Sequence, residues 1–234
     1  MAKLPALVAA IAKHDPRGEV VVANYARTIR EAGLIPTTKR GAGASEMTPT
    51  EGCNLLLALS EVGNARKAPE TVRLLREAIM FGPWPDEPDD DPAIGLTDFA
   101  IGEHTQSLGV FLEQLIRCIG AHGICMPSKD RRSSLLFSEI KLTAPDSWGA
   151  SAKIVFNYMQ PDEFEVEFSA LTERAVKLSE TDASLDERYE RLMQSHGPAN
   201  APGISFEVRL TASVVSDVAR CLAGADGRAH RDAV

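Results

Sequence analysis

Apolar residues in the first third of the chain recur at intervals of three and four, which is the spacing of one face of an α-helix. This pattern predicts four amphipathic helices before residue 82. The second helix is expected to end at Gly33, because glycine readily adopts the left-handed conformation that terminates a helix. The predicted inward positions of the four helices are Leu4, Leu7, Val8 and Ile11; Val22, Tyr25, Ala26 and Ile29; Cys53, Leu56 and Leu57; and Val72, Leu75 and Ile79.

The third helix has the clearest start signal, in Thr48-Pro49-Thr50-Glu51. Threonine can cap a helix, proline suits the first helical position, and the glutamate can reach back to the amide of the cap residue. The fourth helix is expected to begin near Pro69 for the same reason.

Later in the chain the apolar residues alternate instead. Segments 135–142, 152–158, 164–168 and 204–210 place them at every second position, as a strand does when one of its faces is buried. Such alternation favours an antiparallel sheet that is wet on one face. The predicted inward residues are Leu136, Ile140 and Leu142; Ala152, Ile154, Phe156 and Tyr158; Phe164, Val166 and Phe168; and Ile204, Phe206, Val208 and Leu210.

Helical spacing returns in segments 108–119, 185–193 and 213–222, which can cover the other face of the sheet. The expected fold class is therefore α+β, in which a helix-turn-helix-like N-terminal domain is followed by an antiparallel sheet domain with covering helices.

A stretch rich in proline and acidic residues, GPWPDEPDDDP, separates the two patterns. Proline prevents a continuous helix and the acidic side chains repel one another, so we expect an extended linker. The predicted division is a helical domain at 1–82, a linker at 83–92, an α+β domain at 93–224 and a disordered tail at 225–234.

The charge differs between the two regions. The whole chain carries −8, yet residues 1–82 contain 11 basic and 8 acidic residues, against 14 basic and 25 acidic residues in the remainder. This asymmetry suggests that the two regions meet different partners.

The strongest chemical signal is the loop between the second and third helices. Its threonines can donate hydrogen bonds to phosphate, its two cations can neutralise it, and its small residues let backbone amides approach. Two arginines on the preceding helix can extend the cationic surface. We predict that this region binds double-stranded DNA through Arg27, Arg30, Thr37, Thr38, Lys39, Arg40, Gly41, Gly43 and Ser45. The alternative is an ordinary surface loop.

Residues 26–59, ARTIREAGLIPTTKRGAGASEMTPTEGCNLLLAL, resemble uncharacterised phage- or mobile-element-associated helix-turn-helix proteins of proteobacteria. The resemblance covers about one-seventh of the chain and includes no catalytic motif. It implies a phage-related DNA-binding protein.

Other chemistry is less favoured. The chain lacks a Gly-Lys-Ser/Thr phosphate loop and a serine elbow, so we expect no catalytic residues, no cofactor and no enzyme. Cys118, His122 and Cys125, with His104, make a zinc site imaginable, but buried thiols and a surface histidine are the preferred interpretation. We therefore expect no metal.

No apolar run is long enough to span a membrane, and we see no signal-peptide pattern, so a cytoplasmic location is expected. The leading hypothesis is a DNA-binding transcriptional regulator whose C-terminal domain forms a homodimer, senses a ligand or contacts a protein partner. The alternative is a protein-interaction or assembly module that does not bind nucleic acid.

Overall fold

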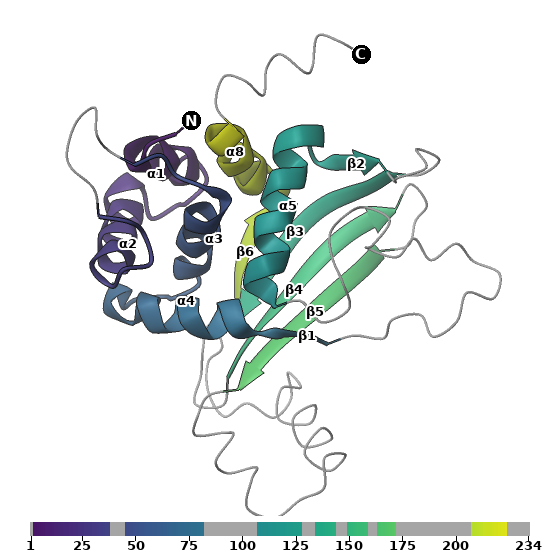
Figure 1. The fold of residues 1–234 in the computed structure, drawn as a ribbon. Helices are drawn as coiled ribbons and strands as arrows, with labels where there is room; N and C mark the ends of the chain where they lie inside the picture. The colour runs from purple at the N-terminus through teal and green to yellow at the C-terminus, as the bar shows by residue number, and fades with distance from the viewer. Residues whose placement is uncertain are drawn as a thin grey trace, which may run out of the picture.

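The chain folds into helices packed against one antiparallel sheet (Figure 1). The computed structural model describes residues 2–37, 45–81, 107–127, 134–143, 149–158, 163–171 and 207–223. In chain order the elements are α1 (Leu4–Ala12), α2 (Glu19–Glu31), α3 (Pro49–Ala58), the 3-10 helix η2 (Ala65–Lys67), α4 (Ala68–Glu77), β1 (Ile79–Phe81), α5 (Leu108–His122), β2 (Cys125–Pro127), β3 (Ser134–Thr143), β4 (Gly149–Tyr158), β5 (Glu163–Leu171), β6 (Glu207–Thr211) and α8 (Ala212–Ala223). The predicted α+β class is confirmed.

The predicted helix ends are confirmed at α2 and α3. Gly33 follows α2 with φ of 80°, and the amides of Gly33 and Leu34 donate to the carbonyls of Arg30 and Ile29, which closes the helix with a Schellman motif. At the start of α3, the Thr48 amide donates to the Glu51 carboxylate over 2.6 Å, as part of a complete capping box.

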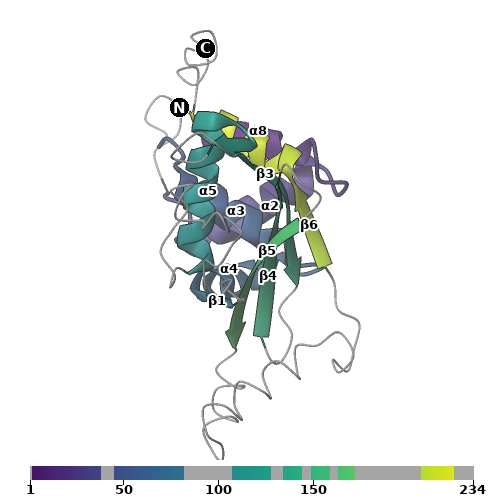
Figure 2. The same cartoon turned by 90° about the vertical axis from the view of Figure 1, so that its right-hand side faces the viewer.

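The strands lie in the order β1-β5-β4-β3-β2. Strand β6 pairs with the same edge of β3 as β2 does, but β2 pairs near the start of β3 and β6 near its end. Every described pairing is antiparallel. Figure 2 shows the helices gathered on one side of the sheet. The helices therefore cover one face of the sheet, as the alternation of apolar residues predicted.

One inward position on β3 was predicted wrongly. A register shift between Phe137 and Glu139 moves the alternation by one residue. Phe137 is buried, where it packs edge-to-face on Phe156, whereas Leu136 is 38% exposed. After the shift, Ile140 and Leu142 are buried as expected.

The fourth helix is also shorter than predicted. It ends at Glu77, and Ile79, expected on its apolar stripe, instead begins β1 and pairs with Ser169 of β5. Ala78 turns the backbone to an extended conformation and its carbonyl accepts from the amide of Leu108. The segment that directly follows the N-terminal helices thus forms an edge strand of the sheet.

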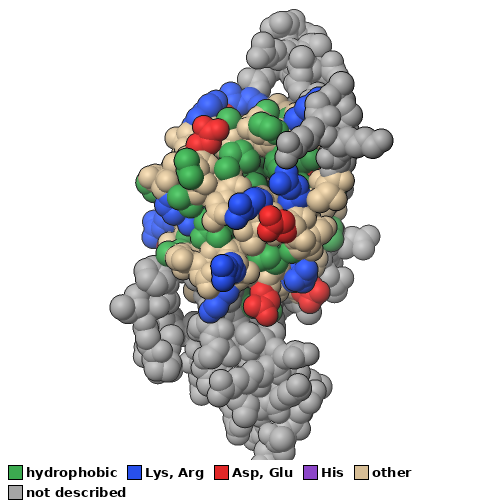
Figure 3. Space-filling model, turned by 90° about the vertical axis from the view of Figure 1, so that its left-hand side faces the viewer, with side chains coloured by type: hydrophobic (Ala, Val, Ile, Leu, Met, Phe, Trp, Pro, Cys, Tyr) green, Lys and Arg blue, Asp and Glu red, His purple; other side chains and the backbone are tan. Residues whose placement is uncertain are grey.

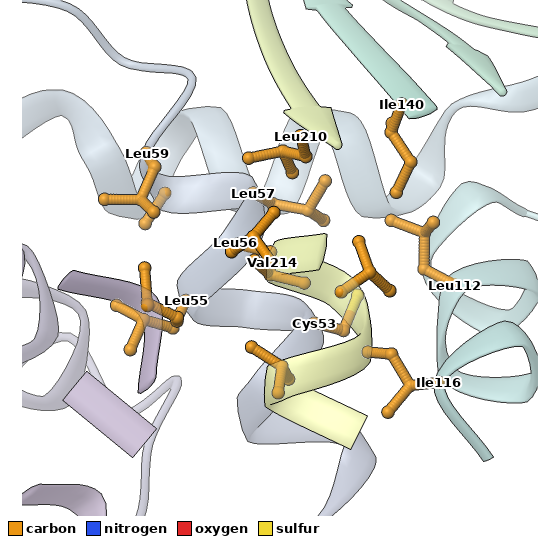
Figure 4. Close-up of a cluster of buried hydrophobic side chains, with 14 of the residues drawn as sticks. Cys53, Leu55, Leu56, Leu57, Leu59, Leu112, Ile116, Ile140, Leu210 and Val214 are labelled. Atoms are coloured by element: carbon orange, nitrogen blue, oxygen red, sulfur yellow. The ribbon is translucent and has the colours of Figure 1, made fainter. Parts of the chain in front are cut away.

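A single apolar core runs through both of the predicted domains. Helix α3 lies at its centre, and Figure 4 shows its Cys53, Leu56 and Leu57 on the side of Leu210 of β6, Val214 of α8 and Leu112 of α5, whereas Leu55 points the other way. At the α3–α8 contact, Gly52 lies close against α8, because a Cβ there would lie 2.7 Å from a methyl group of Leu222, which would have to shift. The division into domains stays a prediction, but the two regions share this core.

Several predictions fall outside the described residues. They are the linker at 83–92, the helix at 185–193, the inward residues Ile204 and Phe206, and the tail at 225–234. The predicted inward side chains of Tyr158, Phe164, Val166 and Phe168 are likewise not described. Among the described helices, none combines the length and apolar character needed to cross a membrane.

Candidate nucleic-acid interface

The basic loop is attached to the body of the protein at both ends. Residues 38–44, which include Thr38, Lys39, Arg40, Gly41 and Gly43, lie outside the described residues. On the first side Ile35 is buried and the carbonyl of Leu34 accepts from Asn54 of α3 over 2.7 Å. On the second side Met47 is buried and its amide donates to the carbonyl of Ala2 over 2.8 Å. The loop therefore starts and ends at fixed points near α3 and α1.

The described residues that flank the loop differ in exposure. Thr37 is exposed, so its hydroxyl is accessible to a ligand, whereas Ser45 is half-buried. The sequence places two further predicted residues, Arg27 and Arg30, on α2.

Helix α2 buries Val22, Tyr25, Ala26 and Ile29, as predicted, and turns its other side outward. Arg27 lies on the outer side, is 64% exposed and forms an ion pair of 3.6 Å with Glu31 one turn later. Arg30 lies in the last turn and is half-buried. An exposed pair of this kind is weak, about 0–1 kcal/mol, so it leaves Arg27 available to a competing anion.

Three further cations lie on elements that pack against α2. Arg66 and Lys67 are exposed on η2, and the Arg73 guanidinium of α4 donates to the carbonyl of Ala32 at the end of α2 over 3.3 Å. We call Arg27, Arg30, Arg66, Lys67 and Arg73 the basic face. Figure 3 shows Lys and Arg side chains spread over the side of the molecule that carries α1 and α2.

Carboxylates accompany the basic face. Glu31 pairs with Arg27, and Glu70 is exposed in the first turn of α4. The face is therefore mixed, with five cations against these two carboxylates, and the sequence adds Lys39 and Arg40 in the adjoining loop. In the sequence, Arg66, Lys67 and Arg73 only added to the count of basic residues in 1–82. The packing of η2 and α4 on α2 brings them to this surface.

The burial of α3 bears on the helix-turn-helix prediction, which stays a prediction. Helix α3, the expected partner of α2 at the DNA, has seven of its ten residues buried, from Gly52 to Ala58. A DNA-reading helix must offer an exposed side to the major groove, which is about 12 Å wide. Most side chains of α3 pack instead against neighbouring elements such as α5 and α8, so only residues 49–51 of this helix stay partly exposed.

The zinc alternative gains no support from the described geometry. Cys118 is half-buried, and burial raises the pKa of its thiol, which disfavours the thiolate that zinc requires. Cys125 is exposed on β2. Within the described parts of the chain, no three potential metal ligands of the His, Cys, Asp or Glu type come together.

No protein-family model, curated protein or solved structure matches this chain.

Proposed function

We propose that the protein is a DNA-binding regulator that contacts duplex DNA through the basic face and the loop at 37–45. The observation that carries the proposal is that the cations of α2, η2 and α4 belong to elements that pack together, although α2 is far from η2 and α4 in sequence. Phosphates along a duplex backbone are spaced to meet several such cations at once.

The loop supplies the closest approach to DNA in this proposal. Its glycines admit the phosphate backbone to within hydrogen-bonding distance of main-chain amides, and Lys39 and Arg40 neutralise the charge. The described residues on both sides of the loop are held by the core, so the loop is anchored close to the end of α2 and can act together with the basic face. Contacts of this kind position a protein on DNA, and any base specificity comes from side chains of the loop or of α2.

A mobility-shift titration of the full-length chain with a mixed-sequence DNA duplex tests the proposal. We expect binding that is weakened by Lys39→Ala/Arg40→Ala and by Arg66→Ala/Lys67→Ala. The matched control is Arg117→Ala, because Arg117 is 60% exposed but lies on α5. Equal affinity of all three variants and the wild type would show that binding, if any, does not use the proposed surface.

A protein-interaction module is the second candidate, and Val20 supports it. Among the large apolar side chains in the described part of the chain this residue has the highest exposed fraction, 84%, and it would give a protein partner an apolar contact on α2. A hetero-complex that tolerates the loop variants but is lost with Val20→Asp would favour this function over DNA binding. The proposed dimerisation or ligand sensing by the C-terminal region is tested by light scattering and by the titration described below.

A further inference from the structure

A cavity of about 350 Å³ opens where the start and end of the described chain meet. Its walls come from α1 and the α1–α2 connection, from the turn after α3, and from the junction of β6 with α8. Four lining residues are almost fully buried apolar side chains, Ile11, Leu59, Leu210 and Val214. Val62 is 38% exposed and contributes an apolar wall near the surface. The inner part of the cavity therefore suits an apolar group.

Basic side chains also line this cavity. They are those of His14, Arg17 and Arg209. His14 pairs with Asp217 and Arg209 pairs with Glu207, and neither carboxylate lines the cavity. Asp15 is the acidic residue among those that line it. The polar boundary thus offers hydrogen-bond donors, each of which also has a carboxylate partner in Asp217, Asp15 or Glu207.

Arg17 is held in place by its neighbours. Its guanidinium donates to both carboxylate oxygens of Asp15, at 3.0 and 2.8 Å, and to the carbonyl of Leu59 at 3.1 Å. It also lies over the ring of Tyr25, 5.2 Å from the ring centre. A cation fixed in this way loses little side-chain entropy when an anion binds.

We propose that this cavity binds a small carboxylic acid with an apolar body. The apolar inner wall would take the hydrocarbon part, and the donors would take the carboxylate. The volume corresponds to about a dozen waters at about 30 Å³ each, which is room for a ligand of about ten non-hydrogen atoms such as octanoate. The inference goes beyond the proposed DNA interface and depends on none of its residues.

Calorimetric titration of the full-length chain with hexanoate and octanoate tests the proposal, with octylamine as the probe of reversed charge. Each methylene buried in the apolar part is expected to tighten binding up to about fourfold, the equivalent of about 0.8 kcal/mol. Val62→Trp should narrow the cavity and weaken octanoate binding at least tenfold. Val110→Trp is the matched control, because Val110 is 44% exposed on α5 and does not line the cavity.

A second variant, Arg209→Gln, tests the charge without altering the apolar wall, since Arg209 is 62% exposed. It should weaken octanoate binding and should not weaken the binding of octylamine, because the charge removed repels the ammonium group. The proposal is overturned if octanoate does not bind saturably to the wild type. It is also overturned if octylamine binds as tightly, or if Val62→Trp and Val110→Trp bind octanoate equally. None of these outcomes bears on DNA binding.

Discussion

Arg76 of α4 donates to the carboxylate of Glu113 of α5 over 2.6 Å, and this ion pair joins the N-terminal helices to the region beyond the predicted linker. The same guanidinium donates to Asn54 of α3 over 2.8 Å, and Asn54 in turn holds Leu34 at the start of the basic loop. Gly109 makes space for the arginine, because a Cβ there would lie 3.2 Å from it. One polar network thus connects three helices and the loop.

Removing one partner of this pair should destabilise the fold. The side chains of Arg76 and Glu113 are only 25% and 14% exposed, so Glu113→Ala leaves a largely buried cation without its carboxylate. We expect the free energy of unfolding to fall by about 1–3 kcal/mol in urea denaturation. Arg117→Ala, which removes a more distant and exposed partner of Glu113, should cost less than about 0.5 kcal/mol. Similar losses for the two variants would argue against a special role for Arg76.

Two glycines that face α8, Gly52 of α3 and Gly120 of α5, should respond differently to substitution. Gly52→Val should lower stability by about 1–3 kcal/mol, because the added atoms collide with Leu222 and Val218. At Gly120 of α5 the nearest atom to an added Cβ is 3.6 Å away, so Gly120→Ala should be neutral or stabilise by up to about 1 kcal/mol through helix propensity. Thermal unfolding of both variants checks the pair. A stable Gly52→Val protein would mean that α8 is not seated against α3 in this way.

The contact between α1 and α8 should depend on pH. A hydrogen bond of 3.0 Å from His14 holds the pKa of Asp217 below its ordinary value of 3.8, with help from Arg220 and Lys13. A carboxyl whose pKa is lowered by folding contributes stability above its ordinary pKa, and this stability is lost as the pH falls through the lowered value. Asp217→Asn should therefore reduce stability at pH 6 and have a much smaller effect near pH 3. A loss that is the same at both pH values would exclude this linkage.

Thiol reactivity should separate two cysteines in the native protein. Burial raises the pKa of Cys53 to about 12, so its reactive thiolate is scarce and inaccessible, whereas Cys125 is exposed. Labelling with a chromogenic disulfide at pH 8 should modify Cys125 rapidly and Cys53 only after unfolding. Cys125→Ser supplies the control by removing the fast phase. Rapid labelling of Cys53 would indicate that the core around α3 opens readily.

The sequence allowed the elements to be predicted better than their arrangement. The capping box at Thr48 and the turn at Gly33 depend on neighbouring residues, so local rules were sufficient to predict them. The exposure of Leu136 could not be foreseen, because the register shift in β3 is set by its pairing with β4. The short β1 was missed for a similar reason. In the sequence Ile79 fits the helical spacing of the preceding apolar residues, and only its pairing with β5 shows that it is in a strand.

The candidate site was predictable only in part. Arg27 and Arg30 were found from the pattern of α2, but Arg66, Lys67 and Arg73 join them only through the packing of η2 and α4. The burial of α3 was hidden as well, because its sequence carries polar residues such as Asn54 that are satisfied within the core. The cavity bounded by Ile11 and Leu210 requires residues about 200 positions apart, which no local pattern reveals.

The salt dependence of DNA binding by the full-length chain tests the central claim most directly. Fluorescence anisotropy with a short duplex, between about 50 and about 200 mM salt, gives the slope of log K against log salt concentration, to which each neutralised phosphate contributes about 0.9. We expect a steep slope that flattens by about one to two on Arg66→Ala/Lys67→Ala and stays unchanged on Arg117→Ala. Absence of binding at the lowest salt concentration, or the same slope for all three proteins, would contradict the assignment of the basic face to DNA.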